Sequence, residues 1–591
     1  MKKIEDGLAD FTTDRRVLLL SLVAVIIGAI GAFVAFGLLW LIQLFTNIAF
    51  FGRVSVSPAT PAASHLGPWP ILIPVLGGLI IGFMARFGSD KIRGHGIPEA
   101  LEAILIGRSR LDAKVAVLKP LSSAISIGTG GPFGAEGPII MTGGAIGSLI
   151  AQGLHLSSAE RKTLLVAGAA AGMSAVFATP VAAALLAVEL LLFEWKPRSF
   201  IPVAFAAATA AAVRVPLLGQ GPIFAVTPHA AVPVEVLGFA LLVGVVAGLA
   251  SGLLTSMVYA SEDLFQKLPI HWMWWPAIGG LFVGIGGYFD PSILGVGYDV
   301  IHGLLAGRIV GFALMGILIG KSLIWSLSLG SGTSGGVLAP LLMMGGALGA
   351  LEARFIPVGD VGLWAMVGMA AMMGGTMRAP FTAIVFTLEL THDLNVLPAL
   401  FIATVASQAV TVLIMKRSIL TEKVARRGHH LTREYSVDPL DVHRVSEVML
   451  SEFRSVLAEA TVQELADKRA ASGKVFVRHQ GAPIVDEAGR LVGVITLSDL
   501  LRAMDRDDSA VRTALEAGST DLVVTYPDEV LREAVIKMVQ NNIGRLPVVE
   551  RGDPTRLVGY MDRSQLMKSR MRWYEEENIR EGRWKLEGFR A

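Results

Sequence analysis

The sequence predicts an all-α polytopic membrane body, built from two repeats with broken helices and followed by two small α/β modules. The chain has 591 residues, of which 53% are hydrophobic and 17% charged. Its mean hydropathy of +0.59 exceeds what soluble proteins usually show. Nearly all of the long apolar runs lie between residues 17 and 415. The last observation behind this prediction is a pair of internal duplications, one in this apolar region and one in the charged remainder.

The apolar runs differ in length. The first, Val17 to Phe45, is longer than the hydrophobic stretch of a signal peptide and predicts a membrane helix. Runs near 71–87 and 396–415 are also long enough to span a bilayer. Others are short and broken by Gly or Pro, as at 96–98, 128–138 and 330–340. Because irregular backbone survives in lipid only where protein or a water-filled cavity satisfies its amides, these breaks indicate a binding site.

Basic residues predict the orientation. Arg15 and Arg16 precede the first run, and a second basic cluster follows the last run: Lys416, Arg417, Lys423, Arg426 and Arg427. By the positive-inside rule both chain ends are cytoplasmic. We therefore expect a multi-pass protein of the cell (plasma or inner) membrane, in contact with membrane lipid.

The membrane body is duplicated. KPLSSAISIGTGGPFGAEGPIIMTGGAIGSL from Lys119 aligns without a gap with KSLIWSLSLGSGTSGGVLAPLLMMGGALGAL from Lys321, an offset of 202 positions (321 − 119). At an offset of 200, three further residues match their counterparts: Gly168, Pro180 and Glu189 with Gly368, Pro380 and Glu389. The repeat halves are about 17–213 and 232–415. Corresponding broken segments in two halves indicate a central transport site, although the sequence does not show whether the halves are inverted.

A second duplication marks the C-terminal region. APIVDEAGRLVGVITLSDLL, Ala482 to Leu501, resembles LPVVERGDPTRLVGYMDRSQLM, Leu546 to Met567. Each reads as a strand, a turn, a second strand and a helix start. The expected divisions of the chain are a cytoplasmic segment at 1–16, the membrane body at 17–430, a linker at 431–441, modules at 442–505 and 506–570, and a charged tail at 571–591.

Three Gly-rich loops in the body each end in proline, and apolar, helix-like runs are expected to begin after Pro138 and Pro340. A helix N-terminus offers unpaired N–H groups and a partial positive charge, and glycine allows an ion to approach the backbone closely. Partial charges of this kind can bind a dehydrated anion without holding it too tightly for it to leave. The alternative is that the glycines only let helices pack closely. The candidate anion contacts are Gly94, His95, Gly96 and Ile97, then Gly134, Ala135 and Gly137, and then Gly336, Val337, Leu338 and Ala339.

Glu136 lies in the middle loop, at membrane depth. Intramembrane carboxylates are costly and usually functional, so we expect Glu136 to compete with the permeating ion and to act as a gate that protonation releases. A glutamate held permanently by backbone donors is the structural alternative. The repeat-matched Lys119 and Lys321 either strengthen the local field, snorkel, or make structural hydrogen bonds.

These loops resemble motifs of the CLC family of chloride channels and proton-coupled chloride transporters. Gly94-His-Gly-Ile-Pro98 is similar to the family's GSGIP motif, Gly134-Ala-Glu-Gly-Pro138 to GREGP, and Gly336-Val-Leu-Ala-Pro340 to GIFAP. The resemblance implies an inverted-repeat body that forms a homodimer, with one pathway per subunit for chloride or another small anion. It also implies that Glu136 is the external gating glutamate.

The sequence departs from the family pattern at three positions, two of them in these motifs. His95 stands where serine is usual, Leu338 where phenylalanine is usual, and Leu420 where a pore tyrosine is expected in a SIYT-like segment. Anion selectivity is therefore open. His95 either donates an N–H to the anion or bonds to backbone without touching the ion.

The proton-coupled relatives carry an inner glutamate, and here Leu190 takes its position beside Glu189. Glu194 lies one helical turn further on, so Glu189 and Glu194 are the candidates for a proton path. We expect a voltage- or pH-gated chloride channel, with a proton–chloride antiporter of the same family as the alternative.

The C-terminal modules resemble a tandem pair of cystathionine-β-synthase (CBS) domains. Gly493 to Asp499 is similar to their GhxTxxD signature, which implies that Thr496 meets a phosphate and Asp499 a ribose. In the second copy, Asp562 and Gln565 replace these two residues. At most one adenine nucleotide site is implied, and a packing or dimerisation role without ligand is the alternative.

Other functional classes have less support. The chain has no cysteine, which excludes disulfides, thiolate metal sites and cysteine nucleophiles. No nucleophile–base pair or metal cluster stands out, so we expect no enzyme activity, no required cofactor, no metal and no nucleic-acid partner. A membrane-anchored nucleotide sensor acting through its CBS pair is the alternative from another class.

Overall fold

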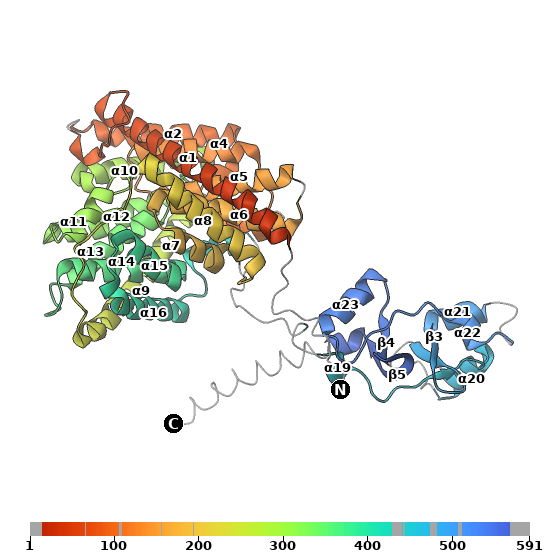
Figure 1. Ribbon diagram of the computed structural model, residues 1–591. Coiled ribbons are helices and arrows are strands. Elements are labelled where there is room, and N and C mark those ends of the chain that lie inside the picture. The colour runs from red at the N-terminus through yellow and green to blue at the C-terminus, as the bar shows by residue number, and fades with distance from the viewer. Residues whose placement is uncertain are drawn as a thin grey trace. The chain divides into compact units, whose positions relative to one another are not determined.

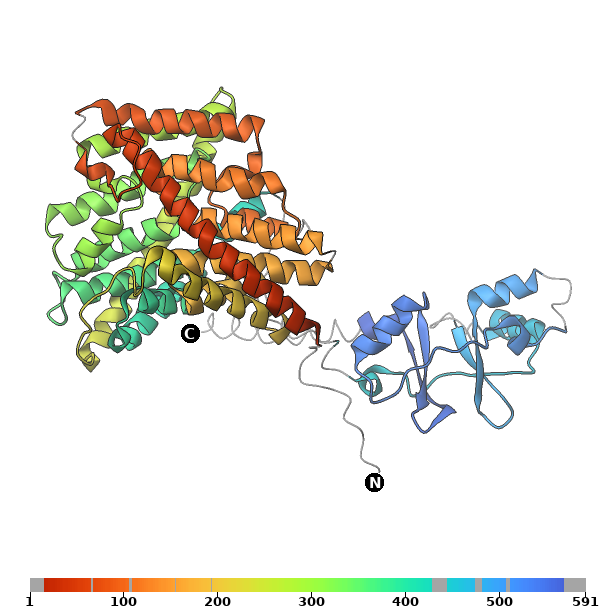
Figure 2. The same ribbon diagram turned by 45° about the horizontal axis from the view of Figure 1, so that its top comes forward.

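The computed structural model describes residues 15–64, 67–105, 109–154, 156–192, 194–427, 440, 444–472, 481–505 and 511–567. The chain divides into two compact units, Met1–Arg433 and Glu434–Ala591 (Figures 1 and 2). Most of the expected N-terminal segment, most of the linker and the whole C-terminal tail lie outside the described residues.

The first unit is built from α-helices joined by loops and short 3-10 turns. Its helices are α1 (Arg16–Phe51), α2 (Leu72–Phe87), α3 (Ile97–Leu105), α4 (Ala113–Gly128), α5 (Glu136–Gly153), α6 (Ser158–Phe177), α7 (Pro180–Leu186) continued by a π-helical turn η4 (Ala187–Leu192), α8 (Pro197–Leu218), α9 (Val234–Gln266), α10 (Trp275–Phe289), α11 (Tyr298–Leu305), α12 (Phe312–Gly330), α13 (Leu338–Glu352), α14 (Val361–Met377), α15 (Pro380–Thr391), α16 (Leu397–Ile414) and α17 (Ile419–Arg426). The 3-10 turns are η1 (Pro61–Ala63), η2 (Trp69–Ile71), η3 (Asp90–Ile92), η5 (Trp272–Trp274), η6 (Pro291–Ile293) and η7 (Leu394–Val396).

Membrane-length helices alternate with short ones. Within the described residues, six stretches are long and apolar enough to cross a membrane: Arg16–Phe51, Trp69–Phe87, Pro197–Leu218, Val234–Gln266, Phe312–Gly330 and Leu394–Arg426. The three long runs expected from the sequence are among them. The expected breaks are also present, because α4 ends at Gly128 and α12 at Gly330, well before the next helix begins.

Two inverted repeats make up this unit. The order α1 to α8 recurs as α9 to α16, and α1 packs on α8 (Figure 1) as α9 packs on α16. In the same way α5 packs on α6, and α13 on α14. The halves meet at an antiparallel bridge between Gly134 and Gly336, in the loops that lead into α5 and α13. The duplicated segments therefore face each other at the centre of the unit.

Glycines bring some of these helices very close together. A Cβ on Gly143 of α5 would lie 2.2 Å from the carbonyl oxygen of Gly168 on α6, and one on Gly345 of α13 would lie 2.5 Å from that of Gly368 on α14. Small residues of this kind allow close contact between membrane helices. The packing role that the sequence left open is therefore real for these glycines, which lie outside the three loops.

The second unit contains two α/β modules. In the first, β1 (Val456–Leu457) pairs in parallel with β2 (Gly481–Val485), which pairs antiparallel with β3 (Leu491–Thr496). In the second, β4 (Arg545–Glu550) pairs antiparallel with β5 (Asp553–Asp562). The helices are α19 (Val445–Val448), α20 (Val462–Ser472), α21 (Leu497–Met504), α22 (Ala514–Ala517) and α23 (Leu531–Gln540). Two apolar cores form, one around β2 and β3 and one around β4 and β5. Ala514 belongs to the first core and Val445 to the second, so each expected module contributes a residue to the core of the other.

Candidate anion site

Three loops converge in front of three helix starts. The N–H of Gly336 donates to the carbonyl of Gly134 at 2.9 Å, and the N–H of Gly134 donates back to Gly336 at 3.3 Å. The N–H of Gly94 donates to the carbonyl of Thr333 at 3.1 Å, which ties the first loop to the third. The structure therefore brings the candidate residues of all three loops together.

Close backbone contact fixes the first two loops against each other. A Cβ on Gly137 would lie 1.8 Å from the carbonyl oxygen of His95, and a Cβ on Gly96 would lie 2.4 Å from that of Gly137. Contacts below 3.0 Å cannot be accommodated without moving backbone, so these two positions require glycine.

The helices start earlier than the sequence suggested. Apolar helices were expected after Pro138 and Pro340, but α5 begins at Glu136 and α13 at Leu338, so each proline is the third residue of its helix. Proline is tolerated there because the first N–H groups of a helix have no acceptor within the helix. Glu136 is consequently the first residue of α5, where the helix dipole favours a negative charge.

The Glu136 side chain fills the space between the loops. It is fully buried, and its Oε1 accepts a hydrogen bond from the N–H of Ala339 at 2.9 Å, while its Oε2 has no partner. A Cβ on Gly134 would lie 1.9 Å from Oε2, and one on Gly336 would lie 2.4 Å from it. The carboxylate therefore occupies room that exists only because both neighbours are glycine.

The two repeat-matched lysines make structural hydrogen bonds. Lys119 Nζ donates to the carbonyls of Ile92 and Gly94, both at 2.8 Å. Lys321 makes the equivalent pair of bonds one repeat later, at 2.9 and 2.7 Å. Both side chains are 0% exposed, so the snorkelling alternative is wrong. Each lysine instead holds the loop that precedes a short helix.

His95 and Glu99 lie at the start of α3. His95 is 2% exposed, and its Nδ1 has no hydrogen-bond partner. Glu99 Oε2 accepts from the N–H of Gly96 at 2.9 Å. The Glu99 carboxylate also pairs with Lys423 of α17 at 3.9 Å and with Arg427, the residue that follows α17, at 3.3 Å. The first loop is thus linked to the end of the membrane body.

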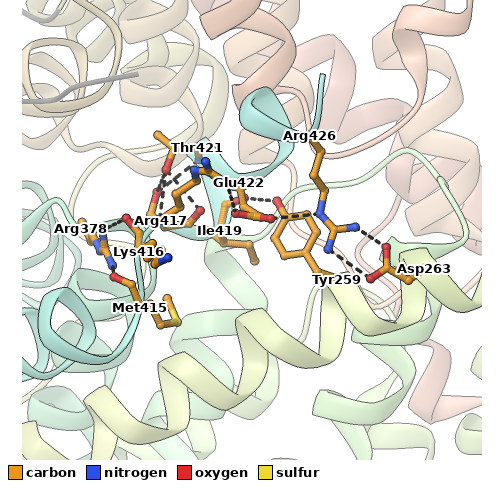
Figure 3. Close-up of polar contacts among 11 residues, drawn as sticks. Tyr259, Asp263, Arg378, Met415, Lys416, Arg417, Ile419, Thr421, Glu422 and Arg426 are labelled. Carbon is orange, nitrogen blue, oxygen red and sulfur yellow. Dashed lines mark hydrogen bonds and ion pairs between the residues drawn. The ribbon is translucent and has the colours of Figure 1, made fainter. Parts of the chain in front are cut away.

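Leu420 is the second residue of α17 and is fully buried. A tyrosine reaches this region from another helix, because the hydroxyl of Tyr259 on α9 donates to the carbonyl of Ile419 at 2.5 Å (Figure 3). Arg426 lies 4.6 Å over the Tyr259 ring and pairs with Asp263. Tyr259 therefore fixes the start of α17. No motif in the sequence marks Tyr259.

Glu189, one of the two glutamates proposed for a proton path, is held by contacts with the opposite repeat. Glu189 Oε2 accepts from the N–H of Thr382 at 2.8 Å and from its Oγ1 at 2.6 Å, at the start of α15. Glu389 accepts in the same way from the start of α7, from the N–H groups of Val181 and Ala182. Glu189 and Glu389 thus each accept hydrogen bonds at the start of a helix in the opposite repeat.

Glu194 lies in the loop before α8. It accepts from Ser199 Oγ at 2.7 Å and pairs with Lys162 at 3.2 Å and Lys196 at 3.5 Å. Although burial opposes the shift, the bond from Ser199 and the two ammonium groups lower the pKa of Glu194 below its usual value. This carboxyl group stays ionised and does not favour proton uptake near neutral pH.

In the C-terminal unit, Thr496 and Asp499 bond to each other. Thr496 Oγ1 donates to Asp499 Oδ2 at 2.6 Å, and the N–H of Asp499 donates to Thr496 Oγ1 at 3.2 Å, which caps α21. In the second copy the N–H of Asp562 donates to Gln565 Oε1 at 2.8 Å. The signature positions therefore make hydrogen bonds at a helix start in both modules.

Sequence reasoning missed a fourth loop. Gly295-Val-Gly-Tyr298 occupies the same place in the second repeat as Gly94-His-Gly-Ile97 in the first, an offset of 201 positions (295 − 94). α3 begins at Ile97 and α11 at Tyr298. The repeat offset was the available signal, but this loop lacks the proline that marked the other three.

Comparison with known proteins agrees with this duplicated membrane architecture. The family profile described as "Voltage gated chloride channel" matches residues 77–412, and that of the CBS domain matches 445–506 and 515–572. The chain therefore belongs to the CLC family of chloride channels and transporters, and it carries a C-terminal pair of CBS domains.

Individual relatives cover the membrane body. The Voltage-gated ClC-type chloride channel ClcB of Escherichia coli O81 and that of Escherichia coli O157:H7 are each 30% identical over 428 residues, which cover 69% of this chain and 99% of the relative. Among solved structures, the fold resembles a slow cyanobacterial Cl−/H+ antiporter (TM-score 0.61, 22% identity, 70% of this chain and 99% of that chain). It also resembles a eukaryotic CLC transporter (TM-score 0.59, 19% identity, 93% and 98%).

Proposed function

We propose that this chain is a chloride channel of the CLC type, gated by Glu136. One observation carries the proposal: a buried carboxylate occupies a glycine-lined space among three helix starts, with one oxygen bound to the Ala339 N–H and the other without a partner. An anion with the same charge would use the same donors. Loss of the carboxylate's negative charge on protonation, or its movement, makes these donors available.

The surroundings of the anion differ from the family pattern in ways that bear on selectivity. His95 is a further candidate donor, because its Nδ1 is buried without a partner beside the first loop. Leu420 offers no hydroxyl, and the nearby Tyr259 hydroxyl is already bonded to Ile419. Backbone amides of the three loops are therefore the main contacts that we propose for the anion. The N–H groups of Gly94, Gly96, Gly134 and Gly336 already donate within the protein, so the candidates are the amides that follow them, up to Ile97, Gly137 and Ala339.

Channel function is favoured over proton–chloride antiport. A coupled exchanger needs an inner carboxyl group that takes up protons, and Leu190 supplies none. Glu189 accepts hydrogen bonds at the start of α15, and the pKa of Glu194 is lowered by Ser199 and two lysines that outweigh the opposing effect of burial. The ClcB relatives are described as channels. Antiport remains the alternative that the experiment below decides.

Orientation and assembly form part of the proposal. Arg16 pairs with Glu160 at 3.0 Å, so the basic chain start and the start of α6 share one face, which we assign to the cytoplasm of the cell membrane. We also propose a homodimer, and an adenine nucleotide as the candidate ligand of the CBS pair at Thr496 and Asp499. A membrane anchor for a nucleotide sensor would not need the converging loops.

The proposal is tested with purified protein in liposomes under a chloride gradient, with chloride efflux and internal pH recorded together. We expect chloride efflux without uphill proton movement, and efflux from Glu136→Ala that no longer responds to pH. Glu235→Ala, which removes an exposed carboxylate at the start of α9, is the matched control and should behave as the unmodified protein.

Each contrary result has a separate meaning. Absence of flux would favour the membrane-anchored sensor. Proton movement against its gradient, driven by chloride, would establish an antiporter. Flux that keeps its pH response in Glu136→Ala would remove the gate from this residue.

A further inference from the structure

The fourth loop, Gly295 to Tyr298, is built like the first. Lys321 holds its carbonyls as Lys119 holds those of the first loop. Gly96 and Gly297 both adopt positive φ angles, +89° and +83°, immediately before their helices begin. The two loops are thus equivalent in backbone conformation, but only the fourth ends in a residue with a hydroxyl group.

This loop packs over the helix that binds the gating glutamate. A Cβ on Gly297 would lie 2.6 Å from Met343 Sδ, and Met343 is one helical turn beyond Ala339 on α13. Glu136 is a charged side chain near the buried Tyr298. The fourth loop therefore approaches the space occupied by Glu136 from the second repeat.

The Tyr298 hydroxyl is buried and has no hydrogen-bond partner among the residues that the structure describes. Its ring packs edge-on against Phe177 and Phe224, with centroid separations of 6.4 and 5.6 Å. Other atoms of Tyr298 line a cavity of about 120 Å³, together with Gln43, Thr46 and Ser292. Burying a hydroxyl without a partner costs free energy, so a state in which this hydroxyl is bonded would recover that cost.

We propose that the Tyr298 hydroxyl receives the Glu136 carboxylate when an anion displaces it from the Ala339 amide. This inference rests on the proposed gating role of Glu136. A displaced carboxylate that remains buried needs a new donor, and Glu136 Oε2 and the Tyr298 hydroxyl are both buried and unpaired in the state seen here. Tyr298 is then a positioning residue of the gate, which stabilises the open state.

The experiment compares Tyr298→Phe with Tyr288→Phe, each in the unmodified protein and in Glu136→Ala, by chloride efflux from liposomes. Tyr288 is an exposed tyrosine on α10 and serves as the matched control. We expect Tyr298→Phe to lower efflux roughly tenfold, as loss of a hydrogen bond to a charged group does, and to have no effect once Glu136 is absent. Tyr288→Phe should change neither background.

A measurement of the thermal unfolding midpoint separates gating from folding. Because the hydroxyl is unpaired in the closed state, Tyr298→Phe should not lower the midpoint. An equal loss of efflux with and without Glu136 would overturn the proposal and indicate direct contact with the anion. Unchanged efflux in Tyr298→Phe would also overturn it. If Glu136→Ala alone has no effect on efflux or its pH response, the gate assignment fails independently.

Discussion

At the scale of single residues, Glu136 depends on its neighbours having no side chains. A Cβ on Gly134 or Gly336 would crowd its oxygens, and among the described residues its backbone partner from the other repeat is Ala339. A carboxylate held to the other repeat by this single bond can be displaced more easily than one with several donors there. The same two glycines therefore give room both to the gate and to the ion proposed to replace it.

Gly134→Ala tests whether this space lies on the anion route. The added methyl group would lie 1.9 Å from the Glu136 Oε2, and in Glu136→Ala it would still occupy space that the permeating ion needs; overpacking costs about 1 to 3 kcal/mol, which corresponds to about a tenfold effect or more. We expect chloride efflux to fall about tenfold or more, in Glu136→Ala as well as in the unmodified protein. Gly238→Ala, which has open space around it, is the control and should leave efflux unchanged. Normal efflux from the double variant would place the route elsewhere.

From the sequence, repeats and prolines marked positions that the structure brings together. The three loops and Glu136 were found because a duplicated glycine pattern surrounded a single carboxylate. Tyr259 and Tyr298 were not found, because each acts through the fold: Tyr259 comes from α9 to bond Ile419, and Tyr298 approaches Glu136 through loop packing. The residues next to Tyr259 and Tyr298 in the sequence do not indicate such contacts.

At the scale of secondary-structure elements, the long helices and their breaks followed from apolar run length, whereas the helix starts did not. The two extra residues ahead of Pro138 and Pro340 depend on loop-to-loop hydrogen bonds that form only when the repeats meet. The capping of α15 by Glu189 and of α7 by Glu389 has the same origin. Contacts between the repeats therefore determine helix starts and helix caps that the sequence of each repeat alone does not specify.

One connection between elements depends on pH. His229, in the segment that joins the two repeats, bonds through Nδ1 to Asp393 at 2.5 Å and through Nε2 to Asp360 at 3.1 Å. Asp360 caps α14, and Asp393 caps η7. Although burial opposes the shift, the hydrogen bonds to Asp393 and Asp360 raise the pKa of His229. Arg308 and His302 line the same cavity and are the other charged or titratable groups there.

We predict that this connection weakens in alkali. Because the folded-state pKa of His229 lies above its unfolded value of about 6.5, its contribution to stability is complete below that value and is lost as pH rises through the folded pKa. The thermal unfolding midpoint of the unmodified protein should exceed that of His229→Gln most at about pH 6, and the difference should shrink by about pH 9. A difference that is constant across this range would contradict the assignment.

At the scale of the whole molecule, the chain consists of a membrane body and a CBS pair with separate cores. The two duplications predicted this division, because each repeat pattern ends where the composition changes. The ClcB relatives match 69% of this chain over 99% of their own length, so they extend little beyond the membrane body. We predict that the membrane body of this chain folds without the CBS pair, because its apolar core is separate from those of the CBS modules.

Truncation after Arg433 tests this independence. The shortened chain keeps every contact within the first unit, including the pairing of Glu99 with Lys423 and Arg427, so we expect chloride efflux within about twofold of the full chain.

If the CBS pair is regulatory, an effect of ATP on efflux should be present in the full chain and absent after truncation. Thr496→Ala in the full chain is the companion variant: it removes the α21 cap and the candidate phosphate contact while the membrane body stays intact. An ATP effect that survives truncation would place the nucleotide site in the membrane body, and loss of efflux with loss of folded protein would show that the body requires the CBS pair.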